Sequence, residues 1–170
     1  MPNYLFFIIF IFICYLLGST PTSIITGKII KGIDIRDHGS GNAGGTNVFR
    51  ILGWKPGLFV IIIDILKGWI PVAILAPKFY LFGPISDLGV VQIISGFAAV
   101  LGHTYTIFAK FKGGKGVGTL GGMMIALFPT VFPFCLLIAI ITLIMTGYVS
   151  LASIIASCSL PILLLVIPPF

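Results

Sequence analysis

A glycine-rich polar stretch in the first third of the chain has the residue types of an anion-binding loop. It reads Gly39-Ser40-Gly41-Asn42-Ala43-Gly44-Gly45-Thr46-Asn47-Val48-Phe49-Arg50. Its glycines let the backbone curl so that successive N–H groups face one point, an arrangement that suits phosphate. Ser40, Asn42, Thr46 and Asn47 add short hydrogen-bonding side chains, and Arg50 adds a bidentate cation. The alternative is a glycine-rich surface turn with one solvated arginine.

A short helix is expected directly after this stretch, because apolar residues recur at helical spacing over 48–52 and Gly53 can end the run. Thr46 or Asn47 would cap this helix, and its N-terminus would face the glycines. Asn47 and Arg50 are three residues apart and would share one face, so the guanidinium could return toward a bound ligand.

A second group of glycines and lysines follows near the middle of the chain. Gly102-His103 leads into Phe108-Ala109-Lys110-Phe111-Lys112-Gly113-Gly114-Lys115-Gly116-Val117-Gly118-Thr119. Gly113, Gly114 and Gly116 could wrap Lys112 and Lys115 around a second anion. The stretch is not a Walker loop, because Gly116 stands where that motif needs Ser or Thr. The alternative is an ordinary basic cluster beside the membrane.

The composition is that of an integral membrane protein. Hydrophobic residues make up 58% of the 170 residues, charged residues only 8%, and the mean hydropathy is +1.21. Soluble domains carry about 25% charged residues. The net charge of +6 comes from loops between apolar segments, so it favours anionic lipid or an anionic substrate over nucleic acid. Cys14, Cys135 and Cys158 lie singly in apolar runs and indicate neither a disulfide framework nor a metal site.

The hydropathy pattern predicts an all-α bundle of about six membrane spans in a single domain, 1–170. The expected spans are 4–28, 57–77, 88–101, 120–128, 131–145 and a last one ending near Ile167. Basic residues mark the segments around both glycine stretches as cytoplasmic, which places the N-terminus outside. The segment 147–153 would then also lie on the cytoplasmic side, so three polar segments would meet at one membrane face.

Two charged residues interrupt the second expected span. Asp64 and Lys67 are three residues apart and share a helix face, and charges within a membrane are usually paired. A structural ion pair is favoured over a direct catalytic role.

The inventory of reactive side chains limits the chemistry. The chain has no glutamate and four aspartates, which argues against a two-metal site that needs clustered carboxylates. A histidine-plus-aspartate acyltransferase motif that began at His103 would need an acid at position 108, where this sequence has Phe108. A lone histidine is also more often a hydrogen-bonded interfacial residue than a base. Direct transfer between two phosphate-bearing substrates, by positioning and charge stabilisation, fits best.

Four motifs in order resemble the bacterial acyl-phosphate:glycerol-3-phosphate acyltransferases, the PlsY family. They are the first glycine stretch, Asp64-x-x-Lys67-Gly68, the second stretch from Gly102-His103 to Val117, and Tyr148-Val149-Ser150-Leu151-Ala152-Ser153. The resemblance implies transfer of a fatty acyl group from acyl phosphate to the 1-hydroxyl of sn-glycerol 3-phosphate. The products would be lysophosphatidic acid and phosphate, at the first committed step of phospholipid synthesis, without acyl-CoA, metal or other cofactor.

The resemblance also implies roles for individual residues. Ser40 and Arg50 would hold glycerol 3-phosphate, and Asn42, Thr46 and Asn47 would shape the first loop. The second motif would bind the acyl phosphate through glycine amides and Lys115, which would help the phosphate leave. The acceptor's own phosphate would assist deprotonation. The expected catalytic residues are Ser40, Arg50 and Lys115. The expected substrate-binding residues are Gly41, Asn42, Gly44, Thr46, Asn47, His103, Lys112, Gly113, Gly114, Gly116 and Ser150.

The resemblance further implies a multi-pass protein of the bacterial cytoplasmic membrane, with the soluble enzyme that makes acyl phosphate as a partner. Family members continue into a seventh helix with a His-Arg-x-x-Asn type segment, whereas this sequence stops at Phe170. A six-span form is therefore expected to bind its substrates but to turn over slowly.

Two other classes remain as alternatives. A transporter of organic phosphates would suit the cationic loops and the charges at Asp64 and Lys67, but transporters usually show repeated halves and bind near the membrane midplane. A structural membrane protein with lipid-binding basic loops would explain the lysines but not the glycine and asparagine pattern.

Overall fold

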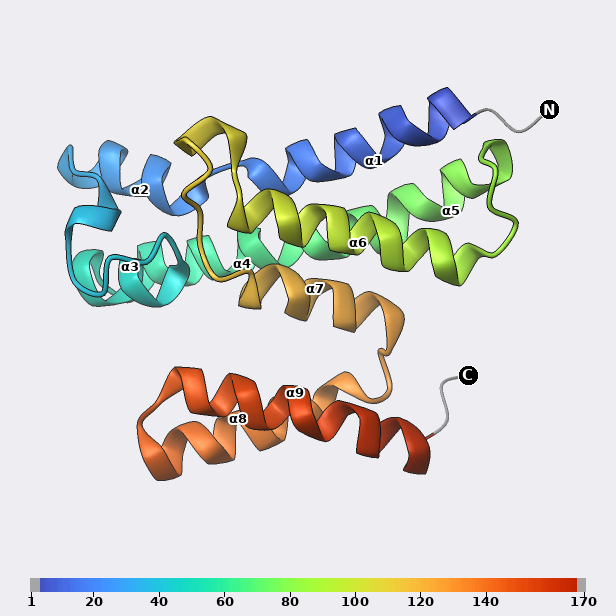
Figure 1. The fold of residues 1–170 in the computed structure, drawn as a ribbon. Coiled ribbons are helices and arrows are strands. Elements are labelled where there is room, and N and C mark those ends of the chain that lie inside the picture. Colours follow the sequence, from blue (N-terminus) through green and yellow to red (C-terminus); the bar gives the residue numbers. More distant parts are fainter. Residues whose placement is uncertain (1–3, 168–170) are drawn as a thin grey trace. The chain divides into compact units, whose positions relative to one another are not determined.

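A computed structural model describes residues 4–167, which form two compact units (Figure 1). The first unit runs to Met123 and the second begins at Met124. Within residues 4–167 there is no strand, so the all-α prediction is confirmed. The single-domain prediction stays a prediction.

The first unit contains most of the helices. These are α1 (Tyr4–Ser19), α2 (Thr22–Lys31), the 3-10 turn η1 (Ile35–Asp37), α3 (Gly45–Leu52), α4 (Trp54–Ile70), the π-helical η2 (Pro71–Leu75), α5 (Ala76–Phe79), the 3-10 turn η3 (Tyr80–Phe82), α6 (Leu88–Thr104), the 3-10 turn η4 (Ile107–Ala109) and α7 (Val117–Leu127), which crosses the boundary between the units. The second unit adds α8 (Phe132–Thr146) and α9 (Val149–Val166).

Four helical segments of the described part are long and apolar enough to cross a membrane: Tyr4–Lys31, Trp54–Phe82, Leu88–Ala109 and Val149–Val166. Val117–Leu127 and Phe132–Thr146 are apolar but shorter. The chain is therefore a multi-pass membrane protein, and the count of six spans stays a prediction.

The first segment is broken in its middle, where the sequence pattern predicted one continuous span. α1 ends at Ser19, and Pro21 stands at the N-cap of α2. Proline lacks the N–H that a continuous helix would use, so the break leaves backbone groups that need other partners. One of them, the carbonyl of Thr20, accepts a hydrogen bond from Lys67 Nζ of α4 at 2.6 Å. The break thus brings polar backbone against the charged part of α4.

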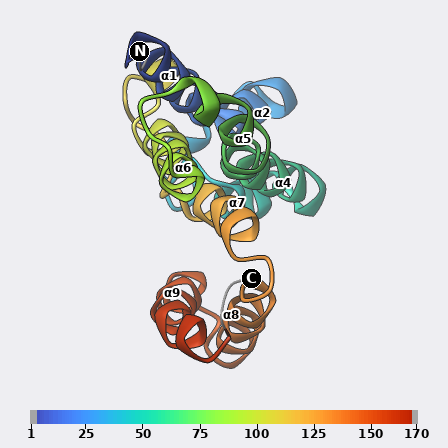
Figure 2. The same cartoon turned by 90° about the vertical axis from the view of Figure 1, so that its right-hand side faces the viewer.

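Small residues let the helices of the first unit approach closely. α1 packs along α6, and a β-carbon on Gly18 of α1 would collide with the backbone of Ala99 (Figure 2). Where the backbone is irregular after Pro71, α6 supplies the missing partners. Ser95 Oγ donates to the Pro71 carbonyl at 3.3 Å, and Gln92 Nε2 donates to that of Val72 at 3.1 Å. Such contacts are how polar backbone is satisfied at membrane depth.

In the second unit, α8 and α9 lie side by side and are joined by a tight turn (Figure 2). Gly147 ends α8 with a left-handed φ of 73°, as glycine commonly does at a helix C-terminus. Helix α9 begins at Val149, so most of the polar segment 147–153 forms the first turns of this helix.

Candidate active site

The first glycine loop, residues 39–46, presents free backbone donors. Gly39 and Gly41 have φ of 62° and 72°, left-handed values that a side chain would strain. Among the described residues, no acceptor is found for the amides of residues 42–46. These amides lead into the first turn of α3, where the partial positive charge of a helix N-terminus adds to them. The loop therefore has the donors that an anion cradle requires.

Asn47 holds this loop in shape. Its side chain is 1% exposed, and its Nδ2 donates to the carbonyls of Ile35 and His38 at 3.0 and 2.9 Å. Its Oδ1 accepts from the Ser40 amide at 3.0 Å. Because the amide group is committed to backbone, Asn47 shapes the loop, and it does not share the exposed surface of Arg50 as the helical spacing suggested.

Helix α3 starts earlier than the sequence predicted and ends where it predicted. Gly44, and neither Thr46 nor Asn47, is the N-cap residue, and it has no side chain to cap with, so that prediction was wrong. The missing cap leaves the first amides of the helix available. Gly53 ends the helix as predicted, with its N–H donating to the Phe49 carbonyl.

The predicted ligand-contacting side chains of the first loop are accessible. Ser40, Thr46 and Arg50 are exposed and Asn42 is half-buried. Within residues 4–167 their side chains have no hydrogen-bonding or ion-pair partner in the protein. Their hydroxyl, amide and guanidinium groups are therefore available to a ligand.

The second loop, residues 110–116, differs from the sequence prediction in which amides it offers. The Gly113 amide donates to the Thr104 carbonyl at 3.0 Å and the Gly114 amide to that of His103 at 3.2 Å. These bonds tie the loop to the end of α6, so neither amide is free to hold an anion. In the described part of the chain, the Lys115 and Gly116 amides have no acceptor, and they precede α7 directly.

The first two residues of this loop have strained backbone angles. Lys110 and Phe111 have φ of 56° and 59°. Such values cost non-glycine residues free energy and persist only where surrounding contacts hold them. Lys112 and Lys115 are exposed, with no ion-pair partner among residues 4–167.

Arg36, which sequence reasoning had not singled out, joins the two loops. Its Nη1 donates to the carbonyls of Ala109 and Lys112, both at 3.1 Å. Its Nη2 lies 2.6 Å from Asp34 Oδ2, and its Nε also bonds that carboxylate. The hydrogen bond from Arg36 lowers the pKa of Asp34 from 3.8 to about 2. The spacing Asp34-x-Arg36 was the only sequence signal, and it is a weak one.

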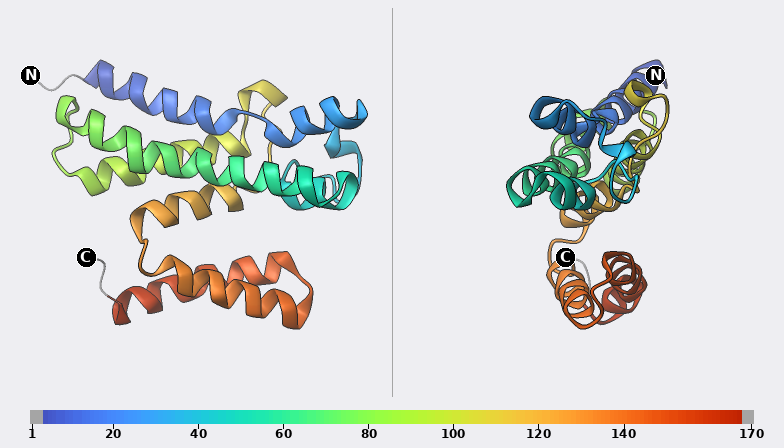
Figure 3. Two further views of the ribbon diagram at one scale, coloured as in Figure 1. Left: turned by 180° about the vertical axis from the view of Figure 1, so that it is seen from behind. Right: turned by 90° about the vertical axis from the view of Figure 1, so that its left-hand side faces the viewer.

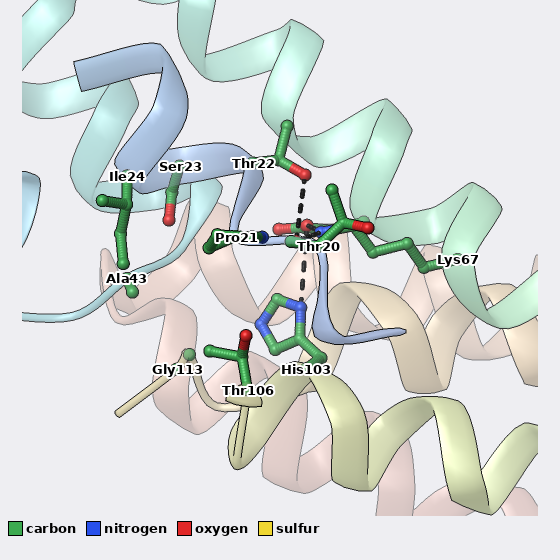
Figure 4. Close-up of a pocket in the computed structure, with 12 residues that line it drawn as sticks. Thr20, Pro21, Thr22, Ser23, Ile24, Ala43, Lys67, His103, Thr106 and Gly113 are labelled. Carbon is green, nitrogen blue, oxygen red and sulfur yellow. Dashed lines mark hydrogen bonds and ion pairs between the residues drawn. The ribbon is translucent and has the colours of Figure 1, made fainter. Parts of the chain in front are cut away.

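A small pocket lies beside the loops (Figure 4). Its lining joins the α1–α2 break to the loops and to the charged part of α4. The lining residues are Thr20, Pro21, Thr22, Ser23, Ile24, Ala43, Asp64, Lys67, His103, Thr106, Gly113 and Gly114. The apolar pattern did not predict this break, although the serines and threonines around Pro21 were a signal for it. Figure 3 shows the loops and the break at the same end of the first unit.

The buried charges of α4 form the pair that their spacing predicted. Lys67 Nζ lies 2.7 Å from Asp64 Oδ1, and these residues are 6% and 5% exposed. His103 Nδ1 lies 3.6 Å from the same oxygen and is also buried. Because Lys67 also donates to the Thr20 carbonyl, the pair joins α4 to the α1–α2 break. His103 faces the pocket from α6 (Figure 4).

The third predicted segment belongs to the other unit. Ser150 is exposed in the first turn of α9, and its part in the site stays a prediction. Among residues 4–167, no three histidine, cysteine, aspartate or glutamate side chains come together in a way that could hold a metal ion.

Comparisons with known proteins point to one family. A model of that family, described as glycerol-3-phosphate acyltransferase, matches residues 8–170. A glycerol-3-phosphate acyltransferase of Chlorobium phaeobacteroides strain BS1 is 47% identical over 163 residues, which are 94% of this chain and 69% of that protein. Its counterpart in Chlorobaculum tepidum is 47% identical over 162 residues, 93% of this chain and 70% of the relative.

Two solved structures of one protein are also similar to this chain. The crystal structure of PlsY (YgiH), an integral membrane glycerol 3-phosphate acyltransferase, in its glycerol 3-phosphate form has a TM-score of 0.84 and 40% identity, covering 96% of this chain and 78% of that one. The lysophosphatidic acid form of the same protein has a TM-score of 0.82 with the same identity and coverage.

Proposed function

This chain belongs to the glycerol-3-phosphate acyltransferase family, and we propose that it transfers a fatty acyl group from acyl phosphate to the 1-hydroxyl of sn-glycerol 3-phosphate. The products are lysophosphatidic acid and inorganic phosphate. A single observation carries this proposal: two loops with unused backbone amides and exposed cations are joined within one unit. A reaction between two phosphate-bearing substrates needs two such anion sites close together.

The first loop is the acceptor site. The free amides of residues 42–46 bind the phosphate of glycerol 3-phosphate, with Arg50 and Ser40 as side-chain ligands. That glycerol 3-phosphate is a substrate is supported by the PlsY structure in its glycerol 3-phosphate form. Thr46 and Asn42 line the same loop, and Asn47 fixes its shape from behind.

The second loop is the donor site. The Lys115 and Gly116 amides at the start of α7 hold the phosphate of the acyl donor, and the Lys115 ammonium neutralises the charge that builds on the departing phosphate. Gly113 and Gly114 contribute by close packing: a β-carbon on Gly114 would collide with the imidazole of His103 and crowd the Ala43 carbonyl.

The transfer is direct. The acceptor hydroxyl oxygen attacks the acyl carbon, the bond from that carbon to the bridging phosphate oxygen breaks, and the hydroxyl proton leaves through the acceptor's phosphate to the released phosphate. The acyl phosphate is already an activated mixed anhydride, so positioning and charge stabilisation are the contributions required of the protein.

The basic loops place this chemistry at the cytoplasmic face of a bacterial inner membrane, with the N-terminus outside. There a soluble enzyme that makes acyl phosphate delivers the donor.

The test is phosphate release by the detergent-purified chain given palmitoyl phosphate and glycerol 3-phosphate in the presence of a chelator. Acceptor-dependent release is expected from the wild type, with large losses in Arg50→Ala and Lys115→Ala. Lys55→Ala is the matched control, because Lys55 is an exposed cation that lies against the ring of Trp54 and outside both loops. Release that ignores the acceptor, or that survives in both loop variants, would contradict the proposal.

A further inference from the structure

Arg36 is held by hydrogen bonds to two distant parts of the chain. An arginine has five N–H donors in a rigid fork. Here Nε and Nη2 bond the Asp34 carboxylate, and Nη1 bonds the two carbonyls of Ala109 and Lys112. With its charge balanced and four of its five donors used, this guanidinium has no pair of donors left for a bidentate phosphate contact, whereas the exposed Arg50 has.

The two carbonyls that Arg36 holds bracket the strained turn. Lys110 and Phe111, both left-handed, lie between Ala109 and Lys112, and the amides that tie the loop to α6 follow directly. Left-handed non-glycine residues persist only where contacts over-determine them. Arg36 supplies two such contacts from a distant part of the sequence.

On its other side, Arg36 is anchored to the first loop. It lies within η1, and the carbonyls of Ile35 and His38 on either side of it accept hydrogen bonds from Asn47. Asn47 Oδ1 also accepts a hydrogen bond from the Ser40 amide. The hydrogen bonds of Asn47, the backbone of η1 and the hydrogen bonds of Arg36 therefore connect Ser40 to the second loop.

We propose that Arg36 is a positioning residue that fixes the donor loop against the acceptor loop. This inference rests on the proposed function, because it assigns one substrate to each loop. Each loop keeps its own binding groups without Arg36, but the two bound substrates lose their alignment. Misplacement of reacting groups by about 1 Å can cost about 10²-fold in rate.

The experiment compares Arg36→Ala and Arg36→Lys with Lys31→Ala as the control. Lys31 is an exposed cation of the same region that bonds only the Ile51 carbonyl, so its loss removes a positive charge without separating the loops. For Arg36→Ala we expect kcat to fall about 10²-fold while KM for both substrates changes little. Millimolar guanidinium should restore part of kcat by refilling the site.

Arg36→Lys separates geometry from charge. One ammonium cannot hold the carboxylate and both carbonyls together, so this variant should also lose kcat, and wild-type turnover from it would overturn the proposal. A rise in KM for either substrate with kcat unchanged would also overturn it, since that result marks direct binding.

Hydrogen exchange supplies a readout that does not depend on turnover. The hydrogen-bonded amides of residues 111–114 should exchange faster in both Arg36 variants and not in Lys31→Ala, and unchanged exchange would refute the positioning role. If the wild type and Lys31→Ala are both inactive, the proposed function fails, while the exchange result still decides whether Arg36 holds the loop.

Discussion

Replacing Asn47 with alanine tests whether this residue shapes the first loop or touches the substrate. The substitution removes three hydrogen bonds, to the Ser40 amide and to the carbonyls of Ile35 and His38. At about 1 kcal/mol net for each bond, the ordered loop loses about 3 kcal/mol relative to open forms. That is a shift of about 10²-fold in the loop's equilibrium.

The expected result is a rise in KM for glycerol 3-phosphate of up to about 10²-fold, with a much smaller change for the acyl donor. The thermal unfolding temperature of the helices should change little, because the lost free energy stabilises the ordered form of the loop and not the helix bundle. Asn47→Asp should be at least as damaging, since it keeps the acceptor for the Ser40 amide but turns a carboxylate oxygen toward two carbonyls.

Hydrogen exchange decides between the two roles. If Asn47 shapes the loop, amides of residues 35–41 lose protection in Asn47→Ala before any substrate is added. An elevated KM with unchanged exchange in this segment would refute the reasoning and make Asn47 a direct ligand.

The other predictions concern charge and close packing. Lys67→Met should destabilise the detergent-solubilised protein by about 3–5 kcal/mol, because it removes the lysine partner of the buried Asp64. The double variant with Asp64→Asn should recover most of this loss, and thermal unfolding measures both. Gly114→Ala should abolish turnover, measured by phosphate release, because the added β-carbon has no room against the neighbouring imidazole. The Asp34 carboxyl should titrate by NMR near its pKa of about 2 and return toward 3.8 in Arg36→Ala. Since its pKa is depressed in the folded state, the stability it contributes is present above the unfolded value and is lost as pH falls from about 4 toward 2. Asp34 therefore stays ionised above pH 5, and its titration should not change turnover in that range.

Much of the fold and part of the candidate site follow from local sequence. The apolar segments, the glycine that ends α3 and the pairing of Asp64 with Lys67 depend on residues within a helical turn or a span of each other. Their spacing alone therefore predicted them. Glycine content likewise predicted two loops with left-handed backbone, because backbone freedom is a property of the residue type.

The tertiary structure decided which of those groups are free. The amides of Gly113 and Gly114 are taken by the end of α6, and Asn47 turns inward to the backbone of η1. Arg36 reaches carbonyls 73 and 76 residues away. Buried backbone groups must find partners wherever the fold places them. The periodicity of apolar residues does not predict hydrogen bonds between residues so far apart in the sequence. The sequence by itself thus determined a membrane protein and predicted two loops suited to anions, and only the packing of its helices decided which backbone donors remain unused and what holds the loops together.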